Sequence, residues 1–170
     1  MLFRGTGDPP PPAVRRFVIR PAASPGRGGT IELSPDGSRL SFPASEGGTS
    51  SLYLHALDQF TPRKLEGAED AYQPRFSPDG QWVVFAADDK LKKVPLDGGN
   101  PVTLCGATNV LGAEWRDDGT IVFGVIAEGL KQVSAEGGEP VPLLTPDTER
   151  GELDFHNPQR LPGGDAILVT

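Results

Sequence analysis

The chain has 170 residues, enough for one domain with a sizeable core, and its 22 glycines and 18 prolines against 36% hydrophobic residues favour short strands and turns over long helices. The net charge of −7 argues against a nucleic-acid surface, which needs lysine and arginine concentrated on one face. The single cysteine, Cys105, excludes an intrachain disulfide and a cysteine-based zinc cluster. We therefore predict an all-β protein.

The N-terminal arm differs in composition from the rest of the chain. Residues 1–13 contain the proline run 9–12, which favours polyproline II and predicts a Pro-rich linker, and residues 14–20 predict an isolated strand. Five arginines lie within residues 1–28 against Asp8 alone. This basic arm is interpreted either as a solvated linker or as a segment attracted to an anionic partner or lipid surface.

No membrane segment or signal peptide is recognisable in the sequence. The chain contains no apolar span of 18 residues, and its first residues lead directly into glycine and prolines. If the working protein is bound to a membrane, its anchor is expected outside this chain.

The most informative stretch is a hairpin pattern at residues 73–85. Its turn, Ser-Pro-Asp-Gly, combines a proline with preset φ, an aspartate that can bond the local backbone and a glycine that accepts positive φ. The second flank alternates as a half-buried strand does, with Val83 and Phe85 on one face and Trp82 and Val84 on the other. Related turns begin at residues 34, 116 and 161.

The spacing of these turns predicts the fold. They start at residues 34, 77, 116 and 161, at intervals of 43, 39 and 45 residues, and residues 91–102 resemble residues 130–141, again 39 apart. Four strands in roughly 40 to 45 residues are typical of a β-propeller blade, of which ~4 to 8 close a ring. The predicted strands are 30–34, 39–44, 51–57 and 63–65, then 74–77, 81–86, 91–96 and 102–105, then 113–115, 120–125, 130–134 and 141–144, with a fourth set that starts at 158 and stops after 166–170.

These strands predict an incomplete β-propeller of about three and a half four-stranded blades. The repeats cover residues of about 29–67, 73–106, 112–145 and 157–170, within a propeller fragment that spans 14–170. A blade buries its faces only against its neighbours, so an open arc leaves an unpaired edge and an exposed apolar face. Further blades are therefore expected, from a longer parent or a second copy.

The residues also carry a family resemblance. The turns followed by Leu40-Ser41-Phe42 and Val83-Val84-Phe85 resemble the TolB-like, WD-like β-propeller repeat. More specifically, residues 57–105, above all Lys90-Leu91-Lys92-Lys93 and Thr103-Leu104-Cys105, are similar to the C-terminal propeller of bacterial transmembrane serine/threonine protein kinases. Two features depart from the repeat: Arg160 replaces an apolar residue, and Gly163-Gly164 replaces Asp-Gly.

The resemblance implies a non-catalytic ligand- or protein-binding module, the sensor or interaction part of such a kinase, on the extracytoplasmic (periplasmic) side. Two alternatives stay open. One is the accessory propeller of a prolyl-oligopeptidase-type serine peptidase, and the other is a free TolB-like interaction protein.

Catalytic motifs are missing from the sequence. A kinase needs a glycine-rich loop, a strand lysine, a catalytic aspartate and Asp-Phe-Gly, and Asp154-Phe155-His156 lacks the glycine. No Gly-x-Ser-x-Gly elbow occurs. Cys105 and His156 could form a nucleophile and base, but a buried structural thiol is the expected role of Cys105. We expect no catalytic residue, no cofactor and no metal site.

Two residue sets have competing interpretations. Asp36, Asp79 and Asp118 invite a calcium interpretation, but each lies in a separate hairpin, and turn formation explains them. The large aromatic side chains are interpreted either as a stacking platform for sugar or nucleic acid or as packing between blades. These aromatic residues are Phe76, Trp82, Phe85, Trp115 and Phe123.

The best candidate for a contact surface is a loop. The connections 67–73, 106–112 and 145–157 are expected to be long and to share one rim near the central channel, where binding usually occurs. The last is the most polar, and we interpret it either as the site for a protein or small-molecule ligand or as a solvated loop. Its candidate residues are Asp147, Glu149, Arg150, Glu152, Asp154 and His156.

Overall fold

The computed structural model describes residues 24–25, 30–161 and 166–170, and the predicted all-β class is confirmed there. The predicted linker 1–13, the predicted strand 14–20 and the glycines at 163–164 lie outside the described residues. The only helical element of the described ranges is η1 (Thr148–Arg150), a 3₁₀ turn. No helix among these residues has the length and apolarity that a bilayer crossing needs.

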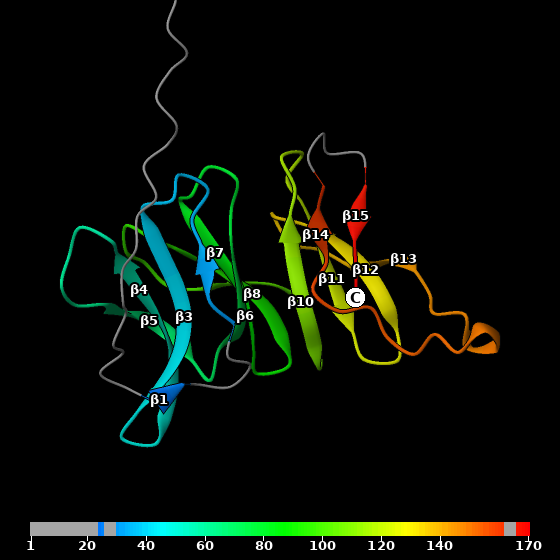
Figure 1. Ribbon diagram of the computed structural model, residues 1–170, viewed down its shortest axis with the longest axis horizontal. Helices are drawn as coiled ribbons and strands as arrows, with labels where there is room; N and C mark the ends of the chain where they lie inside the picture. Colours follow the sequence, from blue (N-terminus) through cyan, green and yellow to red (C-terminus); the bar gives the residue numbers. More distant parts are fainter. Residues whose placement is uncertain (1–23, 26–29, 162–165) are drawn as a thin grey trace, which may run out of the picture.

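The strands form three antiparallel sheets and one additional pair, which follow one another in chain order (Figure 1). In the first sheet β1 (Ser24–Pro25) and β2 (Glu32–Leu33) both pair with β3 (Arg39–Glu46), followed by β4 (Thr49–Ala56) and β5 (Arg63–Glu69). The second sheet contains β6 (Tyr72–Phe76), β7 (Trp82–Ala87), β8 (Lys90–Pro95) and β9 (Val102–Gly106). The third contains β10 (Val110–Trp115), β11 (Thr120–Val125), β12 (Gly129–Ser134) and β13 (Val141–Leu144), and β14 (Gln159–Arg160) pairs with β15 (Ile167–Leu168).

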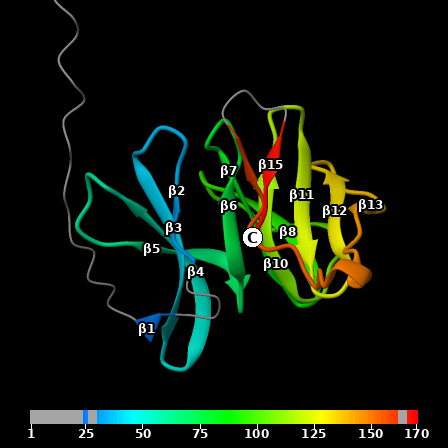
Figure 2. The same ribbon diagram turned by 45° about the vertical axis from the view of Figure 1, so that its right-hand side comes forward.

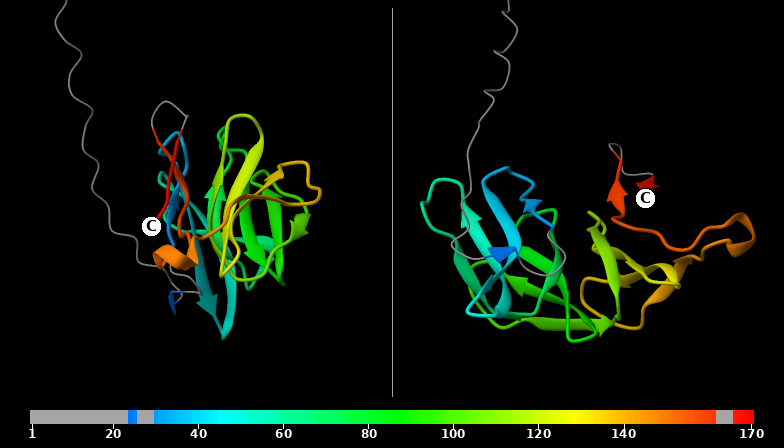
Figure 3. Two further views of the ribbon diagram at one scale, coloured as in Figure 1. Left: turned by 90° about the vertical axis from the view of Figure 1, so that its right-hand side faces the viewer. Right: turned by 60° about the horizontal axis from the view of Figure 1, so that its bottom comes forward.

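The sheets stand side by side in an arc, with their first strands on the inner side (Figures 2 and 3). β2, β6, β10 and β14 are successive neighbours along this inner edge. The arrangement is that of consecutive propeller blades, and it matches the predicted three and a half blades.

Large apolar side chains fill the two spaces between neighbouring sheets. Phe76 and Phe85 pack between the first and second sheets together with Leu52, and Phe123 and Trp115 pack between the second and third. Phe85 and Phe123 are fully buried, so packing between blades accounts for them. Only Trp82, of the five aromatic residues singled out above, is half-buried.

The hairpin turns form as their residue types require. In the second sheet Ser77 Oγ donates to Asp79 Oδ1 at 2.5 Å, Gln81 N donates to the same oxygen at 3.0 Å, and Trp82 N donates to Ser77 Oγ at 2.9 Å. Gly80 has a φ of 67°. Asp36 makes the same contacts in the first sheet, and Asp118 accepts from Thr120 N in the third. The aspartates are thus turn residues, each engaged in its own hairpin.

These bonds lower the pKa of Asp79 and, chiefly through Ser34, lower the pKa of Asp36 to about 2. A carboxyl with a lowered folded-state pKa stabilises the fold above its unfolded pKa and loses that contribution as the pH falls through the folded pKa. Unfolding in urea should therefore become easier between about pH 4 and pH 2. The double variant Asp36→Asn, Asp79→Asn should flatten this dependence of stability on pH. Asp97→Asn, in an exposed turn, is the control and should leave the dependence as steep as in the parent. Equal slopes in all three proteins would contradict the role given to the turn bonds of Asp36 and Asp79.

Two connections are shorter than the sequence suggests. β5 continues to Glu69 and β6 begins at Tyr72, while β9 ends at Gly106 and β10 begins at Val110. The prediction of long loops at 67–73 and 106–112 is therefore wrong. Strand pairing extends into both segments: Glu69 pairs with Ser51, and Val110 pairs with Val125. The connection from β13 to β14 is long, as expected.

Candidate binding site at the propeller axis

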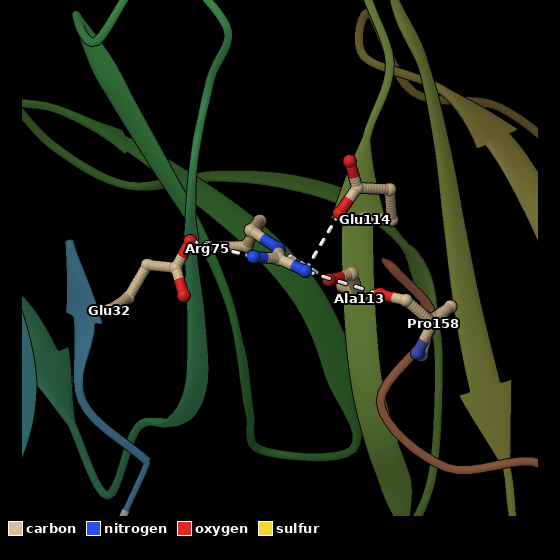
Figure 4. A network of polar contacts seen from close by, with 5 residues as sticks. All are labelled: Glu32, Arg75, Ala113, Glu114 and Pro158. Carbon is tan, nitrogen blue, oxygen red and sulfur yellow. Dashed lines mark hydrogen bonds and ion pairs between the residues drawn. The ribbon is translucent and has the colours of Figure 1, made fainter. Parts of the chain in front are cut away.

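One arginine links the three sheets and the segment before β14 at the inner edge of the arc (Figure 4). Arg75 of β6 lies between Glu32 of β2, at 2.8 Å, and Glu114 of β10, at 2.7 Å. Its Nε donates to Ala113 O at 2.9 Å, and Nη2 donates to Pro158 O at 3.1 Å, just before β14. The guanidinium is suited to this role because it is planar and has several donors in a fixed geometry.

The charged side chains of the network occupy one equivalent position in the first three repeats, and Gln159 holds that position in the fourth. Glu32, Arg75, Glu114 and Gln159 each lie two residues before the start of the hairpin turn, so the inner strands present acid, base, acid and amide in turn. The three charged side chains retain only 11 to 19% of their exposure. Partial burial strengthens the attraction between the charges but makes each one costly to leave unpaired.

Glu114 is the most buried of these charges. Burial raises the pKa of its carboxyl, although the neighbouring Arg75 opposes the shift, as does the backbone N–H of Arg160. Arg160 itself pairs with Asp117. The residue that departs from the apolar repeat pattern thus adds polar contacts between the third sheet and the β14–β15 pair.

A cavity of about 380 Å³ opens beside this network. Four of its lining residues, Thr30, Gln73, Gly112 and Asn157, occupy one equivalent position in the four repeats, two residues before Glu32, Arg75, Glu114 and Gln159, and we call these four residues the mouth of the cavity. Thr30 Oγ1 donates to Gln73 Oε1 at 3.0 Å. We call this space the axial cavity; the other residues that line it are Ile31, Glu32, Pro74, Arg75, Ala113, Gln159, Leu168 and Thr170.

Glycine is needed at one point of the mouth. Gly112 has a φ of 127°, and a Cβ there would lie 2.9 Å from Asn157 Cα. Asn157 N also donates to Leu111 O at 2.9 Å. The close approach lets the segment before β14 lie against the third sheet and complete the wall of the axial cavity.

The six predicted loop residues do not line the axial cavity. Asp147 accepts from the N–H groups of Glu149 and Arg150, and Glu152 accepts from Asp147 N at 2.9 Å, so several of these polar groups bond within the loop. Asp154 accepts from Ala127 N at 2.5 Å, and the backbone of His156 pairs with Thr170. Their role in binding stays a prediction.

Cys105 lies in the core between the second and third sheets. Burial raises the pKa of its thiol, which disfavours the thiolate that a nucleophile requires. This environment fits a structural thiol.

Radial four-stranded sheets around a polar inner edge define the protein as a β-propeller, here an open arc. The sequence matches no protein-family model and no curated protein. A TolB-type protein of Agrobacterium tumefaciens has a similar structure, with a TM-score of 0.67, 19% identity, and coverage of 86% of this chain and 56% of that one.

Two further propellers are similar. The propeller domain of Cps50 (Swd1) from Myceliophteria thermophila gives a TM-score of 0.66 at 17% identity, over 89% of this chain and 50% of that one. The propeller domain of the Trilobed protease of Pyrococcus furiosus gives 0.53 at 18% identity, over 86% and 48%. The chain thus spans about half the length of the propellers it resembles.

Proposed function

We propose that the chain is a non-catalytic propeller module that binds a peptide or small polar molecule at the mouth of the axial cavity. The observation that carries this proposal is the convergence of the inner strands of all four sheets on one cavity, held in place by Arg75. Gln73, Asn157 and Gln159 bring amide groups to it. Amides both donate and accept hydrogen bonds, as a peptide backbone does, and rigid placement lowers the entropic cost of binding.

Within this proposal, the chain is the sensor or interaction part of a bacterial transmembrane serine/threonine kinase on the extracytoplasmic side. Support comes from the resemblance of residues 57–105. A second candidate, the accessory propeller of a serine peptidase, is supported by the likeness to the Trilobed protease propeller. The complete reading frame distinguishes them: a kinase core with a membrane helix supports the first, and a Gly-x-Ser-x-Gly hydrolase supports the second.

Binding can be tested by NMR with a mixture of acetylated dipeptide amides as the probe. We expect saturable shifts of the amide signals of Gly112 and Asn157. Asn157→Ala combined with Gln159→Ala should weaken binding about tenfold or more, the loss of one or two hydrogen bonds. Gln59→Ala, in an exposed turn, is the matched control; shifts that are absent, or equal in both variants, would contradict the proposal.

A further inference from the structure

A second cavity lies at the other end of the inner strands, beside the hairpin turns. It has a volume of about 570 Å³ and runs between the second and third sheets. Trp82 and Trp115 line it together with Pro78 and the 46% exposed Val102. We call it the hairpin groove; aromatic and apolar side chains thus form much of its surface.

The two cations of the groove already have partners. Lys93 Nζ lies 4.7 Å from the centre of the Trp82 ring and 3.2 Å from Glu136 Oε1, and Arg116 lies 3.4 Å from Asp118. Lys93 is almost fully buried, so its ammonium helps to fix the tryptophan. The Glu136 side chain, in contrast, is 88% exposed, and an exposed pair contributes little.

Blade packing does not require this pair of residues. The strand registers place Arg39 of the first sheet and Thr120 of the third at the position of Trp82. They place Leu54 and Gln132 at the position of Lys93. The first and third blades therefore fold without a tryptophan and a lysine at the positions that Trp82 and Lys93 occupy in the second blade.

The most exposed charge of the groove is a carboxylate. Asp79, Asp117 and Glu136 contribute carboxylates to its lining; Asp117 pairs with Arg160, whereas the Glu136 side chain is 88% exposed. The chain as a whole is also acidic, with a net charge of −7 although its N-terminal arm is basic. The exposed Glu136 carboxylate and the negative net charge of the chain both favour a cationic ligand over an anionic one.

We propose that the hairpin groove binds an extended, proline-rich segment of a partner protein that carries arginine or lysine beside its prolines. Proline-rich segments are preformed as polyproline II and dock into grooves lined by aromatic side chains. Their rings would pack against Trp82 and Val102, and the basic side chain would pair with Glu136. This site is separate from the axial cavity and does not depend on the function proposed for it.

The chain provides its own reporter for this interaction. Its two tryptophans both line the groove, so tryptophan emission, excited at a wavelength that the two tyrosines do not absorb, reports on that site. The probe is a short acetylated peptide of four prolines flanked by arginines. We expect a saturable change of the emission, and Glu136→Arg should weaken binding about tenfold, because attraction at the rim becomes repulsion.

Glu69→Arg is the matched control, since it makes the same charge reversal at an exposed glutamate that also pairs with a lysine but lies outside the groove, and it should leave the affinity within about twofold. A peptide with glutamates in place of the arginines should bind as weakly as the arginine peptide binds the Glu136→Arg chain. No saturable change, or equal affinities in the two variants, would overturn the proposal. It would also be overturned if replacing prolines 9–12 by alanine raised the affinity more than about tenfold, because the chain's own arm would then be the occupant.

Discussion

Arg75→Ala is expected to lower the free energy of unfolding by about 3 kcal/mol, the lower end of the cost of breaking a buried ion pair. The substitution leaves the carboxylates of Glu32 and Glu114 without their guanidinium and removes the bonds to Ala113 O and Pro158 O. Because these partners lie in the first and third sheets and in the segment just before β14, the loss should affect the whole arc. Urea unfolding followed by circular dichroism measures it.

Arg150→Ala is the matched control. Arg150 is also paired with a carboxylate, Asp147, at 3.2 Å, but its side chain is 80% exposed, so the change should stay within about 0.5 kcal/mol. Adding Glu114→Gln to Arg75→Ala should restore about 1 kcal/mol, because a buried unpaired charge is removed. If both arginine variants were equally stable, Arg75 would not hold the sheets together.

Phe85→Ala should cost about 3 to 5 kcal/mol, the range found when a fully buried aromatic side chain is truncated. Phe85 has no exposed surface and packs with Leu52 of the first sheet and Phe76 of the second. The cavity left behind would open the contact between the first two blades. Chemical denaturation of the variant and the parent gives the difference.

Phe60 offers a control of the same residue type. It lies in the turn between β4 and β5 and is fully exposed. Phe60→Ala should change the free energy of unfolding by less than about 0.5 kcal/mol. A small cost at Phe85, comparable to that at Phe60, would show that the first and second sheets do not pack as described.

The repeat could be predicted because its signals are local. The turn residues bond one another over two to five positions, as Ser77 and Asp79 do, so the sequence contains the hairpin directly. Spacing then predicts the number of blades. The connections were harder to predict, because strand pairing beyond Glu66 and before Ala113 depends on partners in the same sheet, such as Ser51 and Val125.

The axial network was missed because it joins residues about 40 positions apart in different sheets. A signal was present nonetheless: Glu32, Arg75, Glu114 and Gln159 lie in one register of the repeats and alternate in charge up to the last. Composition favoured the loop at 147–156 instead, and its polar residues bond largely within the loop. Which polar residues meet across sheets is set by packing, which local patterns do not contain.

The arrangement of the sheets around an axis can be tested by nuclear Overhauser effects in the isotope-labelled chain. We predict contacts from the Arg75 side chain to Ala113 and Pro158. Among the described residues, the cross-strand backbone contacts of each sheet should stop at its last strand, which is β5, β9 or β13. Contacts that paired β9 with β10 as neighbours of one continuous sheet, without the Arg75 contacts, would contradict a propeller.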